Sequence, residues 1–232
     1  MSQEIQKFKY GRTFHLPWTG HKTTDDKIWD EDLLEKAFSG KEIIITEKMD
    51  GENTTVYDDG TFHARSIDGR WHPSRNRMVG IAKGLGAQLP RGYRLCGENL
   101  YAQHSIAYTK LPCYYMVFGI YDENNMCLSW DDTEYFAKEI GATLVPRIWR
   151  GDWDHFYVNH PDMTRFIMSN DWLSENEYQI KGEIEGYVVR TTEGFHYDDL
   201  GSHCGKYVRF GHIQTDEHWM HQKIRPNGLK EV

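Results

Sequence analysis

The alternation of apolar and polar residues along the chain predicts mostly short β-strands. Lys41–Thr46 is a short β-branched run with polar flanks, which is typical of a buried strand. Asn53–Tyr57 and Thr61–Ser66 flank Asp58-Asp59-Gly60, whose Asp-Gly pair is a strong signal for the turn of a hairpin. Further strands are predicted at Tyr93–Cys96, Tyr114–Tyr121, Ile184–Arg190 and Lys206–Phe210.

Helical segments are fewer than strands. Glu31–Phe38 and Asp132–Ile140 each stop close to a glycine, as helix ends often do. A third helix is predicted over Met163–Ser169, which a proline introduces. Because strands outnumber helices and hairpins outnumber helical crossovers, the pattern predicts an α+β fold with largely antiparallel sheets flanked by helices. The chain shows no internal repeat and no low-complexity linker, so we expect residues 1–232 to form a single domain.

The composition is that of an ordinary globular protein large enough for one core. Of the 232 residues 14% are aromatic, a share that suits either a core or a surface on which bases stack. No apolar run approaches the roughly 18–20 residues that span a bilayer. The stretch Met1–Tyr10 lacks the apolar core of a signal peptide. We therefore expect a cytoplasmic monomer without membrane contact.

The cysteines give no sign of a metal site or a disulfide framework. They show neither Cys-x-x-Cys pairing nor zinc spacing, which indicates reduced thiols in the core. These residues are Cys96, Cys113, Cys127 and Cys204.

Charge is distributed unevenly over this acidic chain. The net charge of −8 argues against a protein coated in positive charge for packaging DNA. Between Arg65 and Arg94, however, basic residues far outnumber acids, with Asp68 as the sole acid. A local basic surface on an acidic protein suits an enzyme that binds phosphates at one site, and the alternative is a solvated surface loop.

The strongest local signal for chemistry is Glu47-Lys48-Met49-Asp50-Gly51-Glu52-Asn53, directly after a predicted strand. Burial at the end of a strand can lower the pKa of Lys48 and free a neutral amine for attack. The Asp-Gly turn that follows would direct the lysine toward a cleft. The pattern Lys-x-Asp-Gly is weak by itself, because a surface lysine before a turn is the commoner explanation. It therefore needs partners elsewhere in the chain.

Matching partners follow in order along the sequence. Gly97-Glu98-Asn99 comes at the end of a predicted strand, and Glu185-Gly186 precedes an apolar one. Tyr115–Asp122 is an aromatic-rich strand, and Lys206-Tyr207-Val208-Arg209 places two cations on a late strand. Each piece alone has an ordinary structural explanation: an edge-strand acid, a core strand or a surface cation pair. Together, in this order and at these spacings, they are difficult to obtain by chance.

These motifs resemble those of the covalent nucleotidyltransferase superfamily, which contains polynucleotide ligases and mRNA capping enzymes. Within it, the chain most resembles RNA ligases of the phage T4 RNA ligase 2 type. The resemblance spans roughly Ile43 to Phe210. The matching segments are Lys48–Gly51 as the nucleophile motif, Ala64-Arg65-Ser66 as the arginine motif, Leu95–Glu98, Tyr115–Phe118, Glu185-Gly186, and Lys206 at the start of the last motif.

The sequence departs from the superfamily pattern in two places. The last motif usually contains Lys-x-Lys, but Val208 stands at the second lysine position and Arg209 lies one residue further on. A shift of one residue on a strand reverses the direction of the side chain. The stretch after Phe210 is too short for the OB-fold domain that DNA ligases and capping enzymes of the superfamily carry, so no OB-fold domain is expected.

The resemblance implies a three-step reaction that uses ATP and Mg²⁺ or Mn²⁺. Lys48 takes AMP from ATP, AMP passes to a 5′-phosphate, and a 3′-hydroxyl displaces AMP. Lys206 and Arg209 would hold α-phosphate oxygens, and Phe118 would stack on adenine. The remaining assignments are Glu47 at the nucleotide site, Glu98 and Glu185 at the nucleotide and the metal ion, and Arg65 and Asn53 at the nucleic acid.

Several alternatives stay open from the sequence. The partner would be RNA with 5′-phosphate and 3′-hydroxyl ends, for which a nick or duplex is possible, and the preference between a nicked duplex and a single strand stays open. A DNA nick ligase, a capping-type guanylyltransferase and a non-catalytic nucleic-acid-binding relative are the rival functions. His212, His218 and His221 invite a zinc site, but without paired ligands they favour hydrogen bonds or contacts with RNA phosphates.

Overall fold

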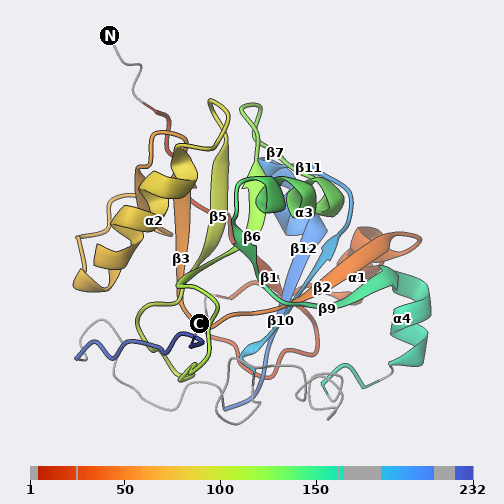
Figure 1. Cartoon of the computed structure of the whole chain (residues 1–232). Helices are drawn as coiled ribbons and strands as arrows, with labels where there is room; N and C mark the ends of the chain where they lie inside the picture. Colours follow the sequence, from red (N-terminus) through yellow and green to blue (C-terminus); the bar gives the residue numbers. More distant parts are fainter. Residues whose placement is uncertain (1–4, 25, 161, 165–183, 212–222, 232) are drawn as a thin grey trace.

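A computed structural model describes residues 5–24, 26–160, 162–164, 184–211 and 223–231 (Figure 1). Two largely antiparallel sheets form the framework. The first contains, in order, β1 (Phe14–His15), β12 (Cys204–Val208), β10 (Gly186–Thr191), β2 (Glu42–Glu47) and β9 (Arg147–Asp152). The second contains, in order, β11 (Phe195–His196), β7 (Met126–Cys127), β6 (Tyr115–Tyr121), β5 (Arg94–Asn99), β3 (Glu52–Tyr57) and β4 (Phe62–Ala64), with β8 (Thr143–Leu144) pairing in parallel with β6.

Helices pack against the two sheets (Figure 1). They are α1 (Glu31–Phe38), α2 (Asn76–Gly86), α3 (Trp130–Glu139), α4 (Trp153–Asn159) and the short α6 (Leu200–His203), with 3-10 turns η1 (Pro73–Arg75) and η3 (Tyr197–Asp199). The fold is therefore the predicted α+β arrangement of antiparallel sheets flanked by helices. Within the described ranges, no helix is long and apolar enough to cross a membrane.

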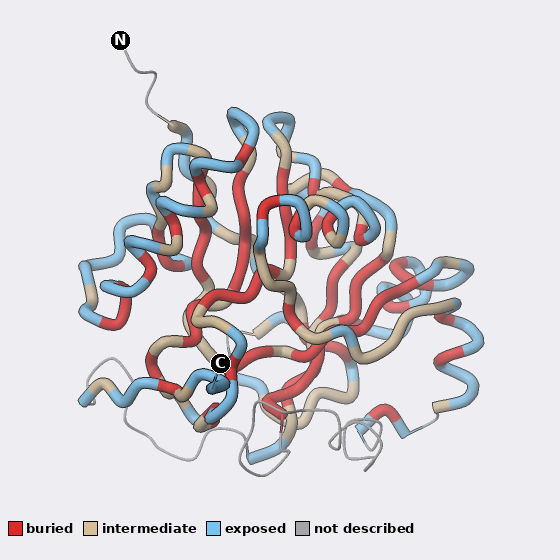
Figure 2. Tube along the Cα trace, in the orientation of Figure 1, coloured by how far each residue is buried: buried red, intermediate tan, exposed pale blue. Residues whose placement is uncertain are grey.

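Strand β2 is buried on both faces, and this explains its unbroken apolar run. Ile43 and Ile45 pack against α1 and α4, in a cluster that includes Phe38 and Phe156. Ile44 points to the opposite face, because side chains alternate along a strand, and it packs in a different cluster. The middle of each sheet is correspondingly the most buried part of the chain (Figure 2).

The two sheets are joined by chain segments that cross from one to the other. The chain leaves the first sheet at the end of β2 and enters the second at the start of β3, across the segment Lys48–Gly51. It returns between β8 and β9, where the Pro146 carbonyl accepts a 2.8 Å hydrogen bond from the amide of Glu47. The predicted nucleophile segment therefore lies at the junction of the sheets.

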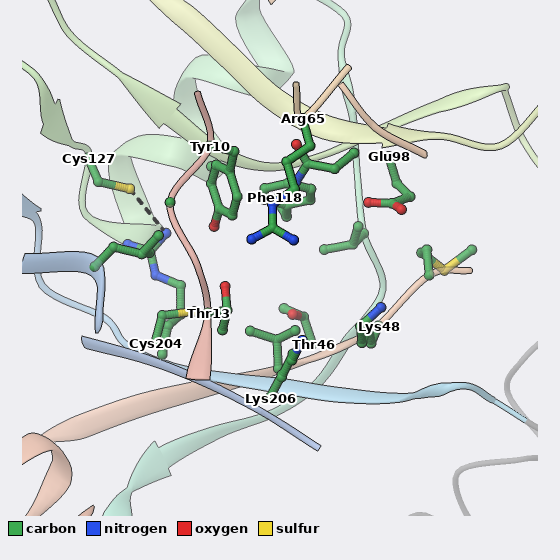
Figure 3. Close-up of a pocket in the computed structure, with 18 of the residues that line it drawn as sticks. Tyr10, Thr13, Thr46, Lys48, Arg65, Glu98, Phe118, Cys127, Cys204 and Lys206 are labelled. Carbon is green, nitrogen blue, oxygen red and sulfur yellow. Dashed lines mark hydrogen bonds between the residues drawn. The ribbon is translucent and has the colours of Figure 1, made fainter. Parts of the chain in front are cut away.

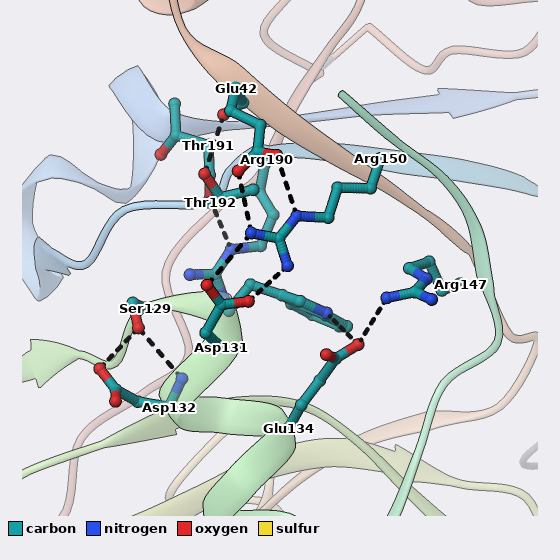
Figure 4. Close-up of polar contacts among 11 residues, drawn as sticks. Glu42, Ser129, Asp131, Asp132, Glu134, Arg147, Arg150, Arg190, Thr191 and Thr192 are labelled. Carbon is teal, nitrogen blue, oxygen red and sulfur yellow. Dashed lines mark hydrogen bonds and ion pairs between the residues drawn. The ribbon is translucent and has the colours of Figure 1, made fainter. Parts of the chain in front are cut away.

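Ion pairs between β9, β2 and α3 add further contacts between the sheets (Figure 4). Arg150 on β9 contacts Glu42 on β2, with Nη2 2.9 Å from Oε2, and also contacts Asp131 on α3. Nearby, Arg147 on β9 donates to Glu134 on α3 at 3.1 Å. Since α3 packs on the second sheet, these contacts connect the two sheets.

Part of the predicted basic surface turned out to be structural, which corrects that interpretation. The segment contains helix α2, which the sequence did not suggest because glycines are poor helix formers. Arg75 is buried and its Nε lies 2.8 Å from Oε2 of Glu52. Arg94 is also buried, 4.4 Å from the centre of the Tyr121 ring. The predicted helix over Met163–Ser169 and His212, His218 and His221 lie outside the described residues, apart from the turn at residues 163–164.

Candidate active site

A cavity of about 190 Å³ lies between the inner faces of the two sheets (Figure 3). Strands of both sheets contribute its walls, and the N-terminal segment contributes Tyr10, Gly11 and Thr13. The predicted site residues that line it are Glu47, Lys48, Asn53, Arg65, Glu98, Phe118 and Lys206. Glu185 reaches the same place through its contact with Lys48. The fold thus brings together motifs that are spread over most of the chain.

Lys48 is held at the end of β2 by contacts on both sides. Its amide donates to the Gly186 carbonyl at 3.0 Å, which continues the pairing of β2 with β10. Its Nζ lies 2.6 Å from Oε1 of Glu185. After Lys48, the chain turns at Asp50, whose carboxylate accepts from the amide of Ile106 at 2.7 Å. The lysine is therefore fixed in position beside a buried carboxylate.

The pKa of Lys48 corrects the sequence-based expectation. Burial alone would lower this pKa, as expected from the end of a buried strand. The negative charges of Glu185 and Glu98 outweigh burial, however, so the pKa lies above its ordinary value. The lysine is a charged, paired ammonium in the structure, and it must lose a proton before it can act as a nucleophile.

Glu98 lies on β5 with its side chain in the cavity. Burial raises the pKa of this carboxyl to about 8, and the charge of Lys48 only partly offsets that effect. Directly opposite, across the β3–β5 pairing, is Asn53, whose buried Oδ1 has no hydrogen-bond partner in the structure. A carboxyl group with a strongly raised pKa beside a buried amide oxygen without a hydrogen-bond partner is typical of a binding site.

Glu185 precedes β10 and is placed by its glycine neighbour. A Cβ at Gly186 would come within 1.9 Å of the Tyr207 carbonyl oxygen. Only glycine therefore allows β10 to lie so close to β12 at this position. That approach sets Glu185 beside Lys48, with 7% of its surface exposed. The Glu-Gly pattern seen in the sequence therefore has a steric reason.

Positive side chains converge on the cavity from three elements. Lys206 on β12 and Arg65 after β4 join Lys48 (Figure 3). Burial lowers the pKa of Lys206, and the positive charges of Lys48 and Arg65 lower it further. The negative charges of Asp26 and Glu185 raise this pKa but compensate only in part. Concentrated positive charge at the mouth of a cavity is suited to the phosphates of a nucleotide.

Arg209 lies away from the cavity, in contrast to its predicted role. Lys206 and Val208 share one face of β12, and Arg209 comes one residue later. Its Nε donates a 2.8 Å hydrogen bond to the Ile184 carbonyl, and the residue is absent from the cavity lining. Among the described residues, Arg65 and Arg190 are the cations that line the cavity besides Lys48 and Lys206.

The deep end of the cavity contains residues that sequence reasoning missed. Tyr10 lies against Phe118 in an edge-to-face arrangement, with ring centres 5.1 Å apart. Thr13 lies in the N-terminal segment just before β1, and Arg190 is the last residue of the strand predicted at Ile184–Arg190. No local motif marks these residues, because only the fold brings the N-terminal segment beside β6 and β10.

The acidic residues fit a divalent cation of the kind that also binds phosphate. Glu98 and Glu185 both act on the pKa of Lys48, so both carboxylates face the same ammonium group. Mg²⁺ is commonly held by one or two carboxylates together with substrate phosphates and waters. No cluster of three or more His, Cys, Asp or Glu ligands occurs in the part of the chain that the structure describes.

Comparison with known proteins gives a family and similar folds. The family model for RNA ligase matches residues 41–208. A mutant of Naegleria gruberi RNA ligase with AMP and Mn aligns at a TM-score of 0.50 and 18% identity, covering 77% of this chain and 52% of that one. An archaeal ATP-dependent RNA ligase aligns at 0.50 and 14%, covering 78% and 45%. The chain thus spans about half the length of these structures. A comparison with curated protein sequences finds no match.

The structural likeness is too distant in sequence to show more than a common fold, and that fold is the ligase type of nucleotidyltransferase domain. Since the family model covers most of the chain, including Lys48, Glu98, Glu185 and Lys206, this protein belongs to the RNA ligase family.

Proposed function

We propose that the chain is an ATP-dependent RNA ligase that joins 5′-phosphate and 3′-hydroxyl ends through a lysyl-AMP intermediate. The observation that carries the proposal is Lys48 itself. It lies in a cavity that Lys206 and Arg65 also line, and its Nζ is 2.6 Å from Oε1 of Glu185. The AMP and ATP named for the Naegleria and archaeal ligases support the choice of nucleotide.

In the first step, Nζ of Lys48 forms a bond to the α-phosphorus of ATP, and pyrophosphate leaves. The ammonium must first lose a proton, and the Glu185 carboxylate lies within hydrogen-bond distance of it. Lys206 would hold oxygens of the α-phosphate, and Phe118 would stack on the adenine. A divalent cation, held by Glu185 and Glu98, would supply neutralisation of the phosphate charge.

The later steps transfer AMP and then release it. An oxygen of the RNA 5′-phosphate attacks the lysyl-AMP phosphorus, the P–N bond breaks, and Lys48 is restored. The 3′-hydroxyl oxygen then attacks the 5′-phosphorus, and AMP leaves as the phosphodiester forms. Arg65, whose side chain is exposed at the cavity, would hold the 5′-phosphate. Asn53, at the floor of the cavity, would contact the phosphates in these steps.

Sealing of a nicked duplex tests the proposal. The wild type should join a 5′-phosphorylated RNA nick in the presence of ATP and Mg²⁺, with less sealing as salt rises. Arg65→Ala should still accept AMP from ATP but fail to seal. Equal loss of both reactions would assign Arg65 to the ATP site. Sealing of an all-DNA nick at the same rate would contradict the choice of RNA, and no sealing of either nick would contradict a ligase.

A further inference from the structure

The C-terminal segment 223–231 is bound firmly to the loop that follows β5. Backbone hydrogen bonds join Gln103 to Arg225 at 2.7 Å, Gly228 to Tyr108 at 2.8 Å, and Leu111 to Gly228 at 3.0 Å. Loop 100–111 is therefore held from outside by a segment more than a hundred residues away in sequence. Neither the family motifs nor the cavity lining includes segment 223–231.

Asn227 is the centre of this attachment. The residue is 4% exposed. Its side chain accepts from the amide of Tyr108 at 3.0 Å and donates to the carbonyl of Leu100 at 2.8 Å. Its backbone donates to the carbonyl of Tyr101 at 2.9 Å and accepts from the hydroxyl of Tyr114 at 3.1 Å. One buried amide thus connects both ends of loop 100–108.

The same loop holds the turn that follows Lys48. The hydroxyl of Tyr108 accepts from the amide of Asp50 at 2.9 Å. The amide of Ile106 donates to the carboxylate of Asp50 at 2.7 Å. Both the backbone and the side chain of Asp50 are therefore fixed by loop 100–108, two residues after the amine that has to attack. Both contacts are buried, so water cannot replace them without cost.

We propose that Asn227 is a positioning residue for the nucleophile, acting through Tyr108 and Ile106 on Asp50. This inference rests on the proposed function of Lys48. A displaced Asp50 shifts the end of β2 and moves Nζ out of line with the α-phosphorus, which costs rate even when ATP binds normally. The C-terminal segment is thus part of the working adenylylation site although it contributes no atom to the cavity lining.

Kinetics of lysyl-AMP formation test the role. Asn227→Ala should lower the adenylylation rate at saturating ATP by about 10- to 100-fold while the KM for ATP changes little. The matched control is Leu34→Ala, a core truncation in α1 that is remote from loop 100–111 and destabilises by about 2–5 kcal/mol. Compared at a temperature at which both variants are folded, Leu34→Ala should keep the wild-type rate. An equal loss in both variants would reduce Asn227 to a stabilising residue.

A gentler variant tests the route from Asn227 to Lys48. Tyr108→Phe removes the hydroxyl that accepts from Asp50 and keeps the ring, so it should slow adenylylation without unfolding the chain. Because both residues act through the same contact, the double variant should be little slower than Asn227→Ala alone. Multiplicative effects would show independent roles and overturn the proposal.

Amide exchange separates this inference from the proposed function. In Asn227→Ala, the amides of Asp50 and Ile106 should exchange faster, while amides of α1 keep their protection. Unchanged protection at Asp50 would overturn the positioning role whether or not the protein accepts AMP. If the wild type accepts no AMP but protection falls as described, the structural link stands, and both the function of Lys48 and the positioning role in catalysis fail.

Discussion

At the scale of single residues, the contact between Lys48 and Glu185 decides the charge state of the cavity. The carboxylate keeps the lysine protonated and in place until the nucleotide arrives. The same carboxylate is the proposed ligand of the divalent cation. If Glu185 exchanges Lys48 for the divalent cation when phosphate charge enters the cavity, the lysine would be released. The negative charge of Glu185, together with that of Glu98, is the reason why burial does not lower the pKa of Lys48.

Replacing Glu185 tests this dual use. Glu185→Gln keeps the shape of the side chain but removes its charge, so lysyl-AMP formation should slow by about 100-fold or more. The rate is measured by transfer of label from α-labelled ATP at limiting Mg²⁺. Glu193→Gln, an exposed glutamate outside the cavity, is the matched control and should behave as the wild type. An unaffected rate in Glu185→Gln would remove this carboxylate from the chemistry.

Glu98 gives the protein a predictable dependence on pH. Its pKa is raised by burial from 4.5 to about 8 in the folded protein, so the unfolded chain loses this proton first. The contribution to stability is therefore complete below about pH 4.5 and lost as pH rises toward 8. In Glu98→Gln this loss is absent. Urea unfolding at pH 5 and pH 8 should show that the free energy of unfolding of the variant rises relative to that of the wild type at the higher pH. An equal difference between the two proteins at both pH values would contradict the raised pKa of Glu98.

The sequence identified the charged residues that meet near Lys48, but it identified neither the rest of the cavity lining nor the charge states of these residues. Lys48, Glu98, Phe118 and Lys206 line the cavity as predicted. The position of Arg209 depended on the direction of one side chain just after β12, and its hydrogen bond to the Ile184 carbonyl is a tertiary contact that the sequence does not contain. The raised pKa of Lys48 depended on distances to carboxylates that lie far away in sequence. Such quantities follow from tertiary contacts, which no local pattern contains.

At the scale of elements, the close approach of β10 and β12 builds the wall that carries Glu185 and Lys206. Gly186→Ala would place a Cβ 1.9 Å from the Tyr207 carbonyl oxygen, so the strands must separate. The variant should lose several kcal/mol of stability, as overpacked sites do, and most of its adenylylation. Gly80→Ala, in α2 with no atom within 4 Å of the added Cβ, should instead stabilise by roughly 0.5–1 kcal/mol. Thermal unfolding distinguishes them, and two equally stable variants would contradict the steric argument.

Strands were easier to predict than the elements around them. The buried strand before Lys48 and the hairpin of β3 and β4 appear where alternation and the Asp-Gly turn place them. Helix α1 has the predicted bounds, Glu31–Phe38. Helix α2 escaped detection because it contains several glycines, which are poor helix formers. Gly86 has a packing reason, because a Cβ there would lie 2.5 Å from the Tyr57 carbonyl oxygen, whereas Gly80 and Gly84 have open space around them.

At the scale of the whole molecule, the cavity exists because two sheets are held at a fixed separation. Arg150 contributes by bridging Glu42 of the first sheet and Asp131 of α3 (Figure 4). Because this network is solvent-exposed, Arg150→Met should lower the free energy of unfolding by no more than about 1 kcal/mol. The difference should shrink in high salt, which screens exposed charges. Denaturant unfolding at low and high salt measures it, and a large loss that salt leaves unchanged would indicate a packing role.

In the proposed reaction, this cavity makes a covalent bond between Lys48 and AMP. The most direct measurement is incubation with α-labelled ATP and Mg²⁺, followed by proteolysis and mass spectrometry of the labelled peptide. The wild type should carry acid-labile AMP on Lys48, labelled ATP should outperform labelled GTP and NAD, and Lys48→Ala should carry none. AMP on another residue, or equal labelling of Lys48→Ala, would contradict the account.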